Sequence, residues 1–101
     1  MGEPVVALPS FRELTEYVRA ALCEQDALDP AQTPFFRTVV RRAGRPWGVV
    51  FHVEGPRLLK TSAVWSADED RIVFYNSTGL RTREVRLSES PELLPEVKRA
   101  A

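Results

Sequence analysis

Residues 47–54, Trp-Gly-Val-Val-Phe-His-Val-Glu, decide the fold of this chain. Successive side chains of an extended strand point to opposite faces, so residues two apart share a face. Along this segment one face is fully apolar, and it is formed by Trp47, Val49, Phe51 and Val53. The pattern predicts a β-strand packed on a core. Gly55-Pro56 then predicts a chain reversal, because glycine accepts turn dihedrals and proline cannot donate a sheet hydrogen bond.

Three more segments extend this pattern toward the C-terminus. Residues 59–66 alternate in the same way, and residues 71–76 are dense in the β-branched and aromatic side chains that suit a pleated surface. The polar residues 67–70 and 76–79 between these segments predict turns. Residues 81–87 are polar and predict a last strand at an edge of the sheet. Short turns between neighbouring strands indicate an antiparallel meander.

The register of the strands is constrained, because a shift of one residue would turn a strand's apolar side chains toward water. Pairing Ser66 with Arg71, and Val53 with Leu59, keeps the apolar sides together. The predicted rows on that face are Trp47 with Trp65 and Ile72, Val49 with Ala63 and Phe74, and Phe51 with Thr61 and Asn76. The small side chain of Ala63 leaves a trough at the centre, where a helix is expected to pack.

A helix is predicted over residues 10–25, ahead of the meander. Ser10 followed by Glu13 is a capping box, in which the serine oxygen accepts a first-turn N–H and the glutamate accepts the serine N–H. Three- and four-residue spacing gives the helix one apolar stripe, formed by Phe11, Leu14, Val18, Ala21 and Leu22. Cys23 is expected beside the stripe as a small packing residue. The predicted fold is therefore α+β, with an N-terminal helix packed on one face of a four- to five-stranded antiparallel β-meander.

Residues 34–42 fit two interpretations. As a strand, the segment alternates and leads through a short turn at residues 43–46 into the strand at Trp47. As a helix, it has Thr33 as a cap and Pro34 at the first helical position. The β-branched run of residues 38–40 and the short turn favour the strand.

The length of 101 residues indicates one domain. We expect an extended lead-in over residues 1–9, a single α+β domain over residues 10–88 and a loosely ordered tail over residues 89–101. The one cysteine cannot form an internal disulfide. No apolar run is long enough to span a bilayer, and the N-terminus lacks the basic region of a signal peptide. The sequence therefore predicts a cytoplasmic protein with no membrane partner.

No motif in the sequence specifies a chemistry. One histidine and one cysteine cannot make a usual zinc site without carboxylates at ligand spacing, and no carboxylate pair has that spacing. The glycines are scattered singly, so no phosphate-binding loop is present. The sequence therefore predicts a protein that is not an enzyme and that uses no metal or cofactor. A small-ligand site near His52, with Lys60 and Tyr75 beside it, is an alternative.

The formal net charge is zero, but the charges are unevenly spread. Residues 1–34 hold six acidic and two basic residues, whereas residues 35–65 hold six basic residues and one acidic residue. Candidate nucleic-acid contacts in the basic segment are Arg37, Arg41, Arg42, Arg45 and Lys60, and the last strand adds Arg81, Arg83 and Arg86. Zero net charge argues against this function, and residues 71–75 lack the interleaved glycine of the RNA-recognition signature. Nucleic-acid binding is therefore kept as an alternative.

Protein association is the function that the sequence favours. One helix covers only one face of a sheet this size, so the opposite face is expected to be open. The predicted register sets two rows there, Gly48 with Val64 and Val73, and Val50 with Ser62 and Tyr75, and it sets His52 beside Lys60. Exposed apolar patches of this kind often bind proteins. We expect a protein partner or a homodimer, with Val50, Val64, Val73 and Tyr75 at the interface.

Overall fold

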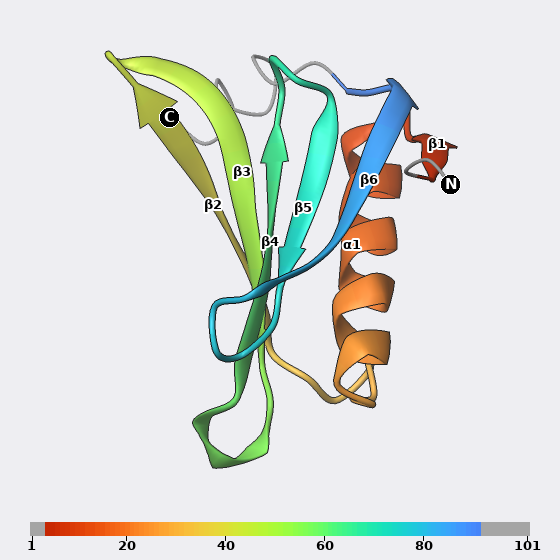
Figure 1. Cartoon of the computed structure of the whole chain (residues 1–101), viewed down its shortest axis with the longest axis vertical. Coiled ribbons are helices and arrows are strands. Elements are labelled where there is room, and N and C mark those ends of the chain that lie inside the picture. Colours follow the sequence, from red (N-terminus) through yellow and green to blue (C-terminus); the bar gives the residue numbers. More distant parts are fainter. Residues whose placement is uncertain (1–3, 92–101) are drawn as a thin grey trace.

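The computed structural model describes residues 4–91, which form one α-helix, a short 3-10 turn and six strands (Figure 1). The helix α1 spans Phe11–Gln25, and the turn η1 spans Pro56–Leu58. The strands are β1 (Val5–Ala7), β2 (Phe35–Arg42), β3 (Arg45–Glu54), β4 (Lys60–Ser66), β5 (Arg71–Tyr75) and β6 (Arg81–Glu89). The predicted α+β class, with an N-terminal helix on an antiparallel sheet, is confirmed.

The six strands form one sheet in the order β1-β6-β5-β4-β3-β2. Strands β2 to β6 make the predicted antiparallel meander, and the strand interpretation of residues 34–42 is correct. The sequence did not predict β1, which pairs parallel to β6 with Val6 beside Leu87. The prediction that the last strand, residues 81–87, lies at an edge is therefore wrong for residues 86 and 87, which β1 covers. The edges of the sheet are β1 and β2.

Helix α1 begins where the capping box predicts. The Ser10 N–H donates to Glu13 Oε2 at 3.1 Å, and the Glu13 N–H donates to Ser10 Oγ at 3.1 Å. The helix lies on one side of the sheet and contacts β3 and β4 (Figure 1). Its fully buried residues are Leu14, Val18, Leu22 and Cys23. The apolar stripe and the placement of Cys23 as a packing residue are thus confirmed.

The register of the sheet departs from prediction at one connection. Between β4 and β5 it is as predicted, with Ser66 opposite Arg71. Between β3 and β4 it is shifted by two residues, and Val53 lies opposite Thr61. The cause is Leu59, which belongs to the connection because its N–H donates to Pro56 O and its C=O accepts from the Gly55 N–H. A shift of two leaves every side chain on its predicted face, since the side-chain period of a strand is two.

The core lies between α1 and the sheet, and Trp65 at its centre has no exposed surface. The rows on this side are Val49 with Trp65 and Ile72, Phe51 with Ala63 and Phe74, and Val53 with Thr61. The predicted row of Trp47 with Trp65 is wrong. Trp47 sits in a bulge, because Val40 pairs with Gly48 while Arg41 pairs with Pro46, and it is only half-buried.

The predicted lead-in and tail fall partly outside the described residues, which exclude residues 1–3 and 92–101. Within the lead-in, residues 5–7 form β1. Within the tail, only residues 89–91 are described, and Glu89 is the last residue of β6. The part of the tail beyond Pro91 therefore stays a prediction.

Candidate protein-binding surface

The side of the sheet opposite α1, called here the outer face, carries three valines in one row. Val50 lies opposite Val64, and Val64 lies opposite Val73. The two-residue shift in register produces this row, which replaces the two separate rows expected from the sequence. Thr38 stands at one end of the row and Glu84 at the other. The centre of the outer face is therefore apolar and uncharged.

A second row on the outer face adds aromatic surface. It runs through Phe36, His52, Ser62, Tyr75 and Arg81. The Phe36 ring stacks on the His52 ring with their centroids 4.8 Å apart, and the Phe36 residue is 43% exposed. The valines of the first row and Tyr75 are half-buried. We define the outer-face patch as Phe36, Val50, Val64, Val73 and Tyr75.

Polar and charged side chains lie at two corners of this patch and contact one another. At one corner Glu84 Oε1 lies 2.7 Å from the Arg81 guanidinium, and Glu84 Oε2 lies 3.9 Å from Arg71 Nε. At another corner Glu54 Oε2 lies 3.3 Å from His52 Nε2 and 3.8 Å from Lys60 Nζ. Paired charges at the rim and apolar side chains at the centre are the usual arrangement of a protein interface.

The three residues of the predicted ligand site are only partly brought together. Lys60 lies opposite Glu54 and His52 lies opposite Ser62, so His52 and Lys60 are diagonal neighbours, and both side chains contact Glu54 Oε2. Tyr75 joins the same row from the other side of Ser62. A hollow of about 250 Å³ at this end of the sheet is lined by Glu54, Gly55, Leu59 and Lys60, without His52 or Tyr75 among the described lining residues.

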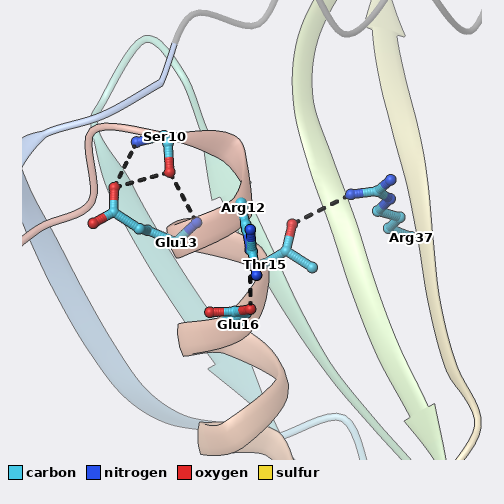
Figure 2. A network of polar contacts seen from close by, with 6 residues as sticks. All are labelled: Ser10, Arg12, Glu13, Thr15, Glu16 and Arg37. Atoms are coloured by element: carbon cyan, nitrogen blue, oxygen red, sulfur yellow. Dashed lines mark hydrogen bonds and ion pairs between the residues drawn. The ribbon is translucent and has the colours of Figure 1, made fainter.

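The four arginines of the predicted nucleic-acid site divide between two places. Arg37 points to the helix side, where its guanidinium lies 4.9 Å from the centroid of the Phe11 ring and donates to Thr15 Oγ1 at 3.3 Å (Figure 2). The other three, Arg41, Arg42 and Arg45, are exposed around the turn between β2 and β3. That turn lies on the far side of the molecule from α1 (Figure 1). The structure therefore does not bring the four arginines into one surface.

A groove between α1 and β2 was not predicted from the sequence. Its lining residues are Phe11, Arg12, Thr15, Glu16, Arg19 and Arg37, and its volume is about 370 Å³. Both walls depend on tertiary placement, because α1 and β2 are separated by a loop and only the packed sheet brings them together. The sequence holds one signal for it. If residues 35–42 form a strand, the Arg37 side chain lies on the same face as Phe35 and Val39.

Cys23 has the character of a packing residue. It is 1% exposed, and burial raises the pKa of its thiol, with the nearby Arg19 guanidinium acting in the opposite direction. A thiol held neutral in the core is a poor nucleophile. Residues 4–91 contain no group of three or more His, Cys, Asp or Glu side chains placed to hold a metal ion.

No protein-family model, curated protein or solved structure matches this chain. Within the described part of the chain, no helix combines the length and apolar character needed to cross a membrane.

Proposed function

We propose that this protein is a non-catalytic interaction domain that associates with a second copy of itself through the outer-face patch. The observation that carries the proposal is the row of Val50, Val64 and Val73, which are adjacent and uncharged. The single helix of residues 4–91 packs on the other side of the sheet, so it does not cover this row (Figure 1). Burial of the row in a dimer removes apolar surface from water.

A two-fold axis suits this surface. Sheets pack face to face about 10 Å apart with their strands roughly 30° from parallel, so two copies of one apolar face can interdigitate. In such a dimer each copy presents the same patch, and the row of small β-branched side chains meets its own copy. The paired charges around the patch stay at the solvated rim, where Glu84 and Glu54 keep their basic neighbours.

The size of the patch determines how strongly two copies are expected to associate. Strands lie about 4.8 Å apart and same-face residues about 7 Å apart, so the patch measures roughly 14 Å across the strands and roughly 7 Å along them between its outer Cα atoms. Such a patch offers a few hundred Å², less than the roughly 800 Å² per partner of a standard interface. We therefore expect weak, reversible association rather than an obligate dimer.

Sedimentation equilibrium of Val64→Lys tests the proposal. Val64 is in β4, at the middle of the valine row, and a lysine there buries an unpaired charge in the dimer. We expect the wild type to dimerise with rising concentration, nearly independently of salt, and Val64→Lys to stay monomeric. The matched control is Leu80→Lys, at a residue that is 65% exposed in the turn between β5 and β6. Wild-type protein that is monomeric at millimolar concentration would contradict self-association.

Nucleic-acid binding is the second candidate function, and one observation favours it. Arg41, Arg42 and Arg45 are exposed together, and the Arg42 guanidinium lies 4.7 Å from the centroid of the Trp47 ring. Binding at this basic end of the hairpin would weaken steeply with rising salt, since each phosphate contact releases counterions. A tight gel shift of single-stranded RNA or DNA with that salt dependence would replace the protein-binding proposal.

A further inference from the structure

Within residues 4–91, strand β2 is an edge of the sheet, because β3 is its one neighbour there. The Glu54 N–H donates to Pro34 O, which makes these two residues a hydrogen-bonded pair at the start of the ladder. Such pairs alternate along antiparallel strands, so Phe36 and Thr38 direct their backbone groups toward β3. The N–H and C=O groups of Phe35, Arg37 and Val39 consequently point to the free edge. Three residues thus offer backbone hydrogen bonds to an added strand.

The free edge runs beside the groove between α1 and β2. The side chains of Phe35, Arg37 and Val39 lie on the helix side of the sheet, as the pairing of Phe35 with Val53 and the contact of Arg37 with Thr15 require. Figure 2 shows Arg37 reaching from its strand toward Thr15 on the helix, and both residues line the groove. A second hollow of about 300 Å³, which Ala20 and Pro30 help to line, continues it past Arg19. An added strand would therefore place every second side chain in this groove.

The charge of the groove is positive. Of its charged residues, Arg12 and Glu16 form an ion pair at 3.4 Å. Among the described residues, the partners of Arg37 are neutral, namely the Thr15 hydroxyl and the Phe11 ring. Arg19 donates to the Pro30 carbonyl and lies over the Phe35 ring, while its Nε is buried with no acceptor among the described residues. Two guanidinium groups thus lack a carboxylate within the described part of the chain.

We infer that β2 and this groove bind an extended acidic segment of another protein as an added strand. The backbone of the segment pairs with Phe35, Arg37 and Val39, and carboxylates at alternate positions reach Arg37 and Arg19. The remaining side chains of the segment lie beside Phe36 and Thr38 on the outer face. This site is distinct from the valine row and does not depend on dimerisation.

A second copy of this chain does not fit the same edge. Strand β2 contains Arg37, Arg41 and Arg42 and no acidic residue. Antiparallel pairing of two β2 strands would bring these cations close together, and like charges on neighbouring strands are destabilising. The same arginines therefore oppose self-pairing at the edge while they favour an acidic partner.

The test uses a blocked eight-residue peptide that alternates threonine and glutamate, titrated by fluorescence anisotropy. We expect it to bind the wild type, and we expect Arg37→Gln to weaken binding by about tenfold or more, since a charge-assisted hydrogen bond is lost. The control Arg45→Gln removes an exposed arginine outside the groove and should leave the affinity unchanged. Val64→Lys should also leave it unchanged, which separates this site from the outer-face patch.

Two further peptides test strand addition itself. N-methylation of alternate amides removes the hydrogen bonds of one edge of a strand and spares the other. Methylation of the amides that face β2 should abolish binding, and methylation of the other alternate set should preserve it. Equal binding by both methylated peptides would overturn the added strand, and equal losses in Arg37→Gln and Arg45→Gln would overturn the groove. Binding of a threonine-lysine peptide, or Arg37-dependent binding of single-stranded DNA in place of the acidic peptide, would overturn the assignment of the partner.

Discussion

Trp65 is the residue on which the core depends most. It is fully buried on β4, with Val49 and Ile72 as its cross-strand neighbours. We expect Trp65→Ala to lower the free energy of unfolding by about 3–5 kcal/mol, because removing the indole leaves a cavity that the sheet cannot close. Urea denaturation measures this, and Trp47→Ala is the matched control. Trp47 is half-buried in the β3 bulge, so its loss should cost less. Equal midpoints for Trp65→Ala and the parent would contradict the assigned core.

The burial of single residues in the strands could be predicted because it depends on which face of the sheet a side chain takes, and faces alternate along a strand. The alternation of Thr61, Ala63 and Trp65 fixes their face whatever the pairing partner, so the two-residue error in register did no harm. Trp47 has the same parity, but its environment depends on the bulge opposite Val40 and Arg41. A bulge is a property of two strands together, and its one local signal, Pro46, was assigned to the turn before the strand.

A single substitution in the turn between β2 and β3 is expected to stabilise the protein. Ala43 and Gly44 both have positive φ, 53° and 79°, as two-residue hairpin turns of type I′ require. A positive φ costs a residue with a Cβ about 1–2 kcal/mol of conformational free energy, and this cost is smaller for asparagine than for alanine. We expect Ala43→Asn to raise the free energy of unfolding by about 1 kcal/mol. Ala31→Asn, in a loop where φ is not positive, is the control. Thermal unfolding that shows no gain for Ala43→Asn over this control would contradict the turn assignment.

Elements with local signals were predicted well, and those without them were missed. Helix α1 carries its own cap at Ser10 and its own stripe, so its bounds followed from the sequence. Strand β1 has only three residues, and its existence depends on the parallel partner β6. A segment this short has no periodicity of its own to recognise. The register at β3–β4 likewise depended on whether Leu59 joined the strand or the connection.

For the whole molecule, the candidate surfaces differ in how far the sequence defines them. The outer-face valines share a parity that is readable in each strand, and they were predicted as a group. Phe36 joined the patch only once residues 35–42 were a strand paired with β3. The groove beside Arg37 could not be predicted, since it lies between α1 and an edge strand whose order in the sheet is set by tertiary packing.

The valines of this chain allow the outer-face proposal to be tested directly by NMR. Methyl spectra of valine-labelled protein are recorded from dilute to millimolar concentration. The outer face contributes Val50, Val64 and Val73, while Val18, Val49, Val53 and Val85 are fully buried in the core and serve as internal controls. The account predicts that the outer-face methyl signals shift with concentration and that the core signals do not. Stationary outer-face signals while other surfaces shift, or no shift anywhere, would contradict it.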